Sequence, residues 1–174
     1  MSIKTIITEP NKFLRQKSKP VTTVGEEERH IMDDMLETMY HANGIGLAAI
    51  QIGIPKRIIV MDISKDKEKK NPMYFVNPII KNKNSENSTY EEGCLSVPNY
   101  FAEIDRPKKC EVDYLDYDGK QKTLSADGLL ATCIQHEVDH LEGILFIDYL
   151  SKLKKTMIVK KLSKQKKSPD RIIV

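Results

Sequence analysis

The segment from Cys133 to Leu141, which reads Cys-Ile-Gln-His-Glu-Val-Asp-His-Leu, constrains the fold of this chain more than any other. It places His136 and His140 four residues apart, with Glu137 directly after the first histidine. On an α-helix this spacing puts both imidazoles on one face, about 6 Å apart along the axis, so both can bind one metal ion. Glu137 then lies about 100° further round, where a general base can take a proton from a metal-bound water. The spacing therefore predicts a helix with a catalytic metal site.

The residues around these three side chains are mostly apolar, which predicts that the helix is buried. Burial would leave two imidazoles and a carboxylate in need of partners, and one metal ion satisfies them together. We expect Asp127 to cap the helix at its start and Gly143 to end it.

Three cysteines are candidates for a third metal ligand. Cys133 lies seven residues from His140, about 10 Å along the helix axis, so these two cannot join His136 at one ion. Cys110, Val112 and Tyr114 alternate with charged residues, so Cys110 is expected with these two on the buried side of a strand. Cys94 lies in a stretch with Gly and Pro that we expect to be an irregular loop, from which a thiolate can approach the helix. We therefore predict Cys94 as the third ligand, with water in the fourth position.

A chain of 174 residues can form a core of its own, and we expect one domain over residues 1–174. Further helices are expected at residues 12–17, 26–42 and 149–167, the last followed by a frayed tail at 168–174. Strands are expected at residues 57–63, 73–80, 109–117 and 120–126, with a polar turn at 81–88. Asp118-Gly119 predicts a hairpin between the last two strands. The fold class is therefore α+β, with antiparallel β-sheets wrapped around the buried central helix and a C-terminal helix at the end.

The N-terminal residues lack the apolar run of a signal peptide, and no segment is apolar enough to span a membrane. We therefore expect a cytoplasmic protein without membrane contact, whose cysteines are thiols or ligands. Residues 151–174 contribute +8 and residues 1–150 contribute −5 to the net charge of +3. The C-terminal helix, with Leu150, Leu153 and Met157 expected on its apolar face, is thus basic. Such a helix can be only a solvated face, or it can bind a polyanion.

Residues 44–51 read Gly-Ile-Gly-Leu-Ala-Ala-Ile-Gln. Their small side chains would let the main chain approach a ligand closely, and Gln51 adds an uncharged amide donor at the end. A tight turn with a small-residue packing seam explains the same residues.

Taken in order, residues 44–51, the segment Glu92-Gly93-Cys94-Leu95-Ser96 and residues 135–140 resemble the three motifs of the bacterial-type peptide deformylases. This family removes the formyl group from the initiator methionine of new polypeptides, a step of N-terminal processing in protein biosynthesis. The resemblance continues through residues 141–143 into the C-terminal helix and covers most of the chain. It implies a metal-dependent hydrolase that releases formate.

The resemblance also implies roles for individual residues. Cys94, His136 and His140 would hold the metal, and a metal-bound water would be the nucleophile. Glu137 would be the general base and acid. The side-chain amide of Gln51 and the main-chain N–H of Leu95 would stabilise the oxyanion. The peptide would bind to the main chain at Ile45 and Gly46, and its methionine pocket would be lined by Leu129, Cys133 and the stem of Glu92.

The resemblance implies Fe(II) as the natural metal, with nickel or cobalt as active substitutes. A Cys-His-His set also fits zinc, and the sequence leaves this choice open. The implied partners are N-formylmethionyl nascent peptides and, through the basic C-terminal helix, ribosomal RNA near the tunnel exit. Phe101 stands where many relatives carry an Arg near the path of the peptide, and Tyr90 and Thr132 make the pocket rim more polar.

The metal motif by itself is compatible with two other hypotheses. The first is a zinc peptidase that cuts internal bonds, which cleavage of unformylated peptides would indicate. The second is a metal- or RNA-binding module in which the ion only stabilises the fold, which a closed four-ligand site would indicate.

Overall fold

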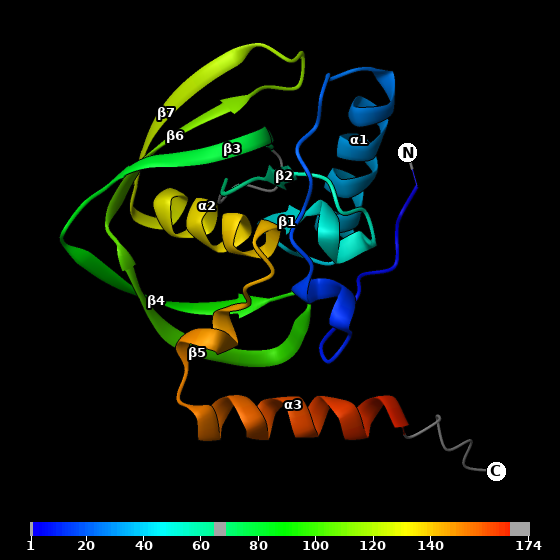
Figure 1. Ribbon diagram of the computed structural model, residues 1–174, viewed down its shortest axis with the longest axis vertical. Helices are drawn as coiled ribbons and strands as arrows, with labels where there is room; N and C mark the ends of the chain where they lie inside the picture. Colours follow the sequence, from blue (N-terminus) through cyan, green and yellow to red (C-terminus); the bar gives the residue numbers. More distant parts are fainter. Residues whose placement is uncertain (1, 65–68, 168–174) are drawn as a thin grey trace.

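The computed structural model describes residues 2–64 and 69–167 (Figure 1). Within these residues the α-helices are α1 (Glu26–His41), α2 (Gly128–Leu141) and α3 (Lys152–Lys167). The strands are β1 (Gly46–Ala48), β2 (Ile58–Met61), β3 (Met73–Lys83), β4 (Asn87–Cys94), β5 (Val97–Pro107), β6 (Lys109–Leu115) and β7 (Gln121–Asp127). Short 3-10 helices are η1 (Lys12–Arg15), η2 (Ala49–Ile52) and η3 (Phe146–Tyr149).

The strands form two antiparallel sheets. One has five strands in the order β1-β2-β3-β6-β7, and β4 pairs with β5 in a separate hairpin. Helix α2 lies between the five-stranded sheet and this hairpin (Figure 1). The predicted α+β class and the central position of the motif helix are confirmed.

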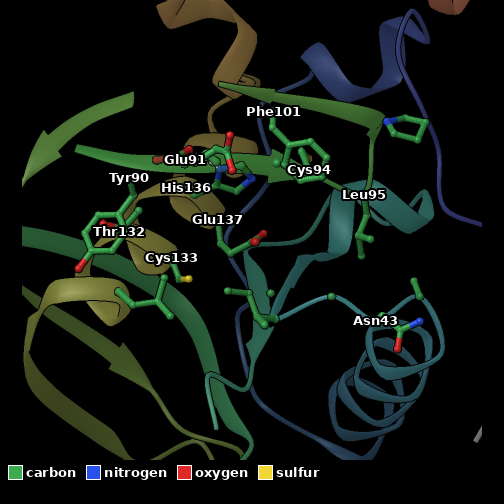
Figure 2. Close-up of a pocket in the computed structure, with 18 of the residues that line it drawn as sticks. Asn43, Tyr90, Glu91, Cys94, Leu95, Phe101, Thr132, Cys133, His136 and Glu137 are labelled. Atoms are coloured by element: carbon green, nitrogen blue, oxygen red, sulfur yellow. Dashed lines mark hydrogen bonds and ion pairs between the residues drawn. The ribbon is translucent and has the colours of Figure 1, made fainter. Parts of the chain in front are cut away.

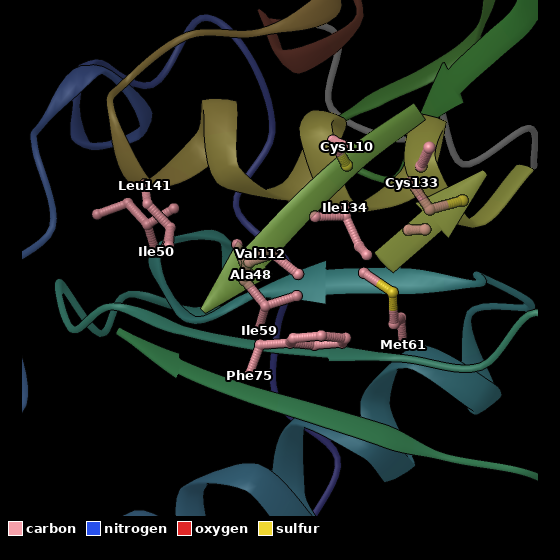
Figure 3. Close-up of a cluster of buried hydrophobic side chains, with 12 residues drawn as sticks. Ala48, Ile50, Ile59, Met61, Phe75, Cys110, Val112, Cys133, Ile134 and Leu141 are labelled. Carbon is pink, nitrogen blue, oxygen red and sulfur yellow. The ribbon is translucent and has the colours of Figure 1, made fainter. Parts of the chain in front are cut away.

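The continuous apolar run of β2 is explained by helices on both faces of the five-stranded sheet. Ile58 and Val60 pack against the Met side chains of α1, whereas Ile59 and Met61 point to the other face. There they join the apolar side of α2 in a cluster that includes Phe75 (Figure 3). Packing against the sheet therefore fixes the position of α2 and its rotation about its own axis. This helix carries the metal motif.

The expectation of an irregular loop around Cys94 is wrong. Cys94 is the last residue of β4, a two-residue turn follows, and β5 starts at Val97 with Pro98 as its second residue. Proline is tolerated there because, among the described strands, β5 pairs with β4 alone, so the missing N–H breaks no second ladder. The strand register shifts between Gly93 and Cys94. The expected polar turn at 81–88 is also shorter, because β3 extends to Lys83.

The ends of α2 are as expected in position. Asp127 occupies the N-cap, although its side chain makes no capping hydrogen bond, and Gly143 follows the helix with a φ of 77°. Glycine adopts this left-handed conformation at no steric cost, which suits it to the position after a helix.

The predicted apolar face of the C-terminal helix is wrong in part. Leu153 is 72% exposed and Met157 is 50% exposed, whereas Leu162 is buried and packs with Ile158 and Val159 against the body. Two apolar stripes lie along this helix, and the body covers only the second. The predicted start is also early, since residues 146–149 form η3. The tail at 168–174 lies outside the described residues. Among the described helices, none has the length and apolarity needed to cross a membrane.

Candidate metal centre and active site

Three side chains from two elements converge beside α2. His136 and His140 lie on one face of this helix, with ring centroids 5.0 Å apart. Cys94, at the end of β4, places its Sγ 3.2 Å from Nε2 of His140. One donor atom from each of the three residues lies within 4.8 Å of the others. The structure therefore brings together the three predicted ligands, whereas Cys110 lies in the apolar core.

The chemistry of this group fits a divalent cation. One thiol and two imidazoles make a three-ligand set that leaves a fourth position open, as in catalytic sites. Burial alone would lower the pKa of His136, but hydrogen bonds with Cys94 and Glu92 raise that pKa well above its ordinary value. Burial, and then the nearby His136, lower the pKa of His140. These three side chains thus favour one positive charge and disfavour a second. A bound metal ion can supply that charge in place of a proton.

Glu92 orients the first histidine. Its Oε2 lies 2.8 Å from Nδ1 of His136. Because a carboxylate only accepts hydrogen bonds, Nδ1 carries the proton and Nε2 is left to bind a metal. Burial alone would raise the pKa of Glu92, but hydrogen bonds from His136 and Arg106 outweigh it and lower that pKa. The sequence predicts only that the stem of Glu92 lines the substrate pocket. The role of its carboxylate in orienting His136 was not predicted.

Arg106 holds Glu92 in place and was also missed. Its Nε and Nη2 donate to the two oxygens of Glu92 at 2.5 and 3.0 Å, and its Nη1 donates to Asp139 on α2 at 2.7 Å. The hydroxyl of Tyr149 donates to the same Asp139 oxygen at 2.8 Å. A charged residue at an inward position of an alternating strand, two after Ile104, is a signal that could have identified it.

Glu137 is buried between α2 and β1, and its Oε2 has no hydrogen-bond partner among the described residues. Burial raises the pKa of its carboxyl to about 7. A group with such a pKa can both accept and donate a proton near neutral pH. Its carboxylate lies against the main chain of Gly46, where a Cβ atom would overlap it. Glycine at this position therefore leaves room for the carboxylate.

The amide of Gln51 is fixed in orientation. Its Oε1 accepts a hydrogen bond from the N–H of Ala48 at 2.8 Å, and its Nε2 donates to Oγ of Ser96 at 3.0 Å. The same Nε2 lies 3.6 Å from Sγ of Cys94. Residues 44–51 thus contain the short strand β1 and most of η2, and they present an amide donor at the metal centre.

A cavity of about 500 Å³ opens beside these groups. Figure 2 shows Cys133, His136 and Glu137 of α2 facing the β4–β5 hairpin across it. All five predicted substrate-binding residues line the cavity. It is also lined by the three residues singled out from the sequence as different from relatives, Tyr90, Phe101 and Thr132. Cys133 contributes to this wall and is not part of the ligand group; burial raises the pKa of its thiol to about 12. The cavity connects the metal centre to solvent, as the binding of a substrate requires.

The family model described as polypeptide deformylase matches residues 3–156. The peptide deformylase of Pelagibacter ubique is 75% identical over 174 residues, which are the whole of both chains. The chain belongs to the peptide deformylase family. The peptide deformylase of Rhizobium meliloti is 54% identical over 168 residues, 97% of each chain. A crystal structure of the peptide deformylase from Ehrlichia chaffeensis in complex with actinonin has a TM-score of 0.92 and 42% identity, covering 97% of this chain and all of the other.

Membership of the peptide deformylase family confirms the resemblance inferred from the three motifs. The family removes the N-formyl group from nascent peptides, so this chain is an enzyme, a hydrolase of protein biosynthesis that acts in N-terminal processing. Peptide deformylases are metalloenzymes, and Cys94, His136 and His140 form the candidate metal site of this one.

Proposed function

We propose that this deformylase hydrolyses the formyl amide of N-formylmethionyl peptides at the Cys94, His136 and His140 centre, with Glu137 as general base and acid. The observation that carries the proposal is the buried carboxylate of Glu137, whose Oε2 has no partner in the described protein and which lines the cavity beside the ligand group. When bound, a divalent ion supplies a Lewis acid that polarises the formyl carbonyl and lowers the pKa of water.

Glu137 moves the proton. Its carboxylate accepts a proton from the water that attacks the formyl carbon, and then donates it to the methionine nitrogen as the C–N bond breaks. The products are a free amine and formic acid, which loses its proton to become formate, and Glu137 returns to its starting state. Its pKa of about 7 suits both transfers near neutral pH. The position beside Gly46 keeps the carboxylate at the cavity wall.

Gln51 and Leu95 act on the carbonyl oxygen. The hydrogen bond from Ala48 holds Oε1 of Gln51, so its Nε2 faces the metal centre and can donate to a developing oxyanion. The main-chain N–H of Leu95 follows directly after the ligand Cys94 and is the second donor. Donors fixed in advance at such a position contribute on the order of 3 kcal/mol to catalysis.

The substrate binds as an added strand on β1. In the described sheet β1 pairs only with β2, so its other edge can pair with a peptide. Ile45 and Gly46 supply this edge, and the methionine side chain enters the cavity between Leu129 and Cys133, with the stem of Glu92 beside it. A flexible thioether suits such an apolar wall.

The proposed natural ion is Fe(II), for which the family resemblance is the support; zinc, nickel and cobalt suit the same thiolate and imidazole donors. The proposed second partner is ribosomal RNA. Helix α3 supports it by exposing several lysines on one element, namely Lys152, Lys154, Lys160, Lys161 and Lys164. Attraction to phosphates would make this binding weaker as salt increases.

Formate release from formyl-Met-Ala-Ser by anaerobically purified, Fe(II)-loaded protein tests the proposal. Glu137→Gln is expected to keep the metal and lose at least about 10²-fold in kcat/KM, because the proton transfers lose their carrier. Glu142→Gln, six residues after His136 and outside the cavity, is the matched control and is expected to retain activity. Unchanged formate release in Glu137→Gln would refute the assignment, and cleavage of internal bonds in unformylated peptides would favour a peptidase.

A further inference from the structure

A second depression, the α3 groove, lies between β5 and the exposed side of α3. Its volume is about 570 Å³. Its floor is mainly apolar and includes Tyr100 and Phe101 from β5 and Met157 and Ile158 from α3. Phe101 is 67% exposed and Met157 is 50% exposed, so both side chains are accessible to a bound segment.

The α3 groove adjoins the catalytic cavity. Phe101 and Glu91 line both of them. Phe101 pairs with Gly93 across the hairpin, and its ring covers Gly93 so closely that a Cβ atom there would overlap it. Gly93 is next to the ligand Cys94. The ring of Phe101 is thus a flat apolar surface that leads from the metal centre to the groove.

The two walls of the α3 groove carry opposite charges. Glu91 and Glu103 lie on the hairpin side, and Lys154 and Lys161 lie on the helix side. None of these four side chains forms an ion pair within the described residues. Nearby lysines differ in this respect, since Lys155 pairs with Asp148. Unpaired charges on both sides of an apolar floor fit a peptide segment with an apolar side chain.

We propose that the α3 groove binds the substrate residues that follow the formylmethionine, from about the third residue onward. This proposal rests on the proposed function. Neighbouring strands are about 5 Å apart and an extended chain advances about 3.3 Å per residue, so two residues carry a peptide from the metal centre across Phe101. The occupant is therefore the downstream part of the same substrate, and apolar residues at positions four and five, beyond Phe101, meet Met157 and Ile158.

Three substrates test this: formyl-Met-Ala-Ser, the hexapeptide formyl-Met-Ala-Ser-Leu-Leu-Ala, and the same hexapeptide with Ser at positions four and five. In the metal-loaded wild type, kcat/KM for the Leu hexapeptide is expected to exceed the other two by about fivefold, the effect of partly burying one apolar side chain. Met157→Glu is expected to abolish this preference and leave the tripeptide rate unchanged. Leu153→Glu, one turn earlier on α3 and outside the groove, is the matched control and is expected to keep the preference.

Equal kcat/KM values for the three substrates in the wild type would overturn the proposal while leaving the proposed function intact. Equal loss of the preference in Met157→Glu and Leu153→Glu would also overturn it, since the effect would then reflect charge on α3. A change of sedimentation coefficient in Met157→Glu with the preference intact would assign the groove to a second copy of the chain. Absence of formate release from the tripeptide would refute the proposed function itself, and with it this extension.

Discussion

Replacing Arg106 by Met tests whether the ion-pair network behind the metal centre controls metal affinity. The side chains of Arg106 and Glu92 are 3% and 5% exposed, and that of Asp139 is 18% exposed. Removal of the guanidinium leaves two carboxylates close together without a cation, which costs about 3–5 kcal/mol. A domain of this size has a free energy of unfolding of about 5–15 kcal/mol, which exceeds this cost over most of its range, so we expect the variant to remain folded. Its Tm is expected to fall by roughly 6–20 °C.

The change in metal affinity distinguishes a role of Arg106 at the metal centre from a role in stability alone. Without Arg106 the pKa of Glu92 rises, its hydrogen bond to His136 weakens, and metal affinity is expected to fall by about 10–100-fold. Chelator competition measures the affinity and urea unfolding measures the stability. Arg57→Met is the matched control, because Arg57 is also largely buried and pairs with Glu142 at 2.5 Å, away from the site. It is expected to lose stability and keep metal affinity. Equal affinities in the two variants would refute the role of Arg106.

Two further substitutions test other parts of the structure. Gly46→Ala is expected to lower kcat/KM for a formylated peptide by about 10²-fold, because the new Cβ displaces Glu137; in the control Gly25→Ala the nearest atom is 3.5 Å away, and full activity is expected. Burial opposes ionisation of Asp34, but hydrogen bonds, the largest from Lys4, lower its pKa from 3.8 to about 2. The folded pKa lies below the unfolded one, so the carboxylate stabilises the protein above pH 3.8, and this contribution is lost as the pH falls toward 2. Asp34→Asn is therefore expected to cost about 2 kcal/mol at pH 7 by urea unfolding and little near pH 2, and a constant difference would contradict this.

Features set by local sequence spacing could be predicted. The interval between His136 and His140 fixes their common helical face whatever the helix packs against. The exclusion of Cys133 from the ligand group follows from the same helical geometry. The hairpin at Asp118-Gly119 follows from turn chemistry, and β6 and β7 flank it in the structure. In each case the relevant interaction lies within a few residues along the chain.

Features set by pairing between distant segments could not be predicted. Nothing near Pro98 indicates that β5 pairs on one side only in the described sheets, and so the sequence predicts a loop there. Arg106 lies 14 residues from Glu92 and 33 from Asp139, and its role exists only after β4, β5 and α2 have packed. The exposed apolar stripe of α3 could not be predicted for the same reason, because its burial depends on segments distant in the sequence. Leu153 fits an apolar helical pattern as well as Leu162 does, and only the position of the body decides which one is buried.

The same reasoning explains why the metal centre needs a supporting network. A straight helix can direct only two ligands at one ion from positions four residues apart, so the third must come from another element. Here that element is β4, and the position of Cys94 depends on how the hairpin sits against α2. Arg106 fixes this relation directly, because it joins Glu92 of β4 to Asp139 of α2. Glu92 also orients His136, so one arginine controls both the distance between the two ligand-bearing elements and the direction of a ligand.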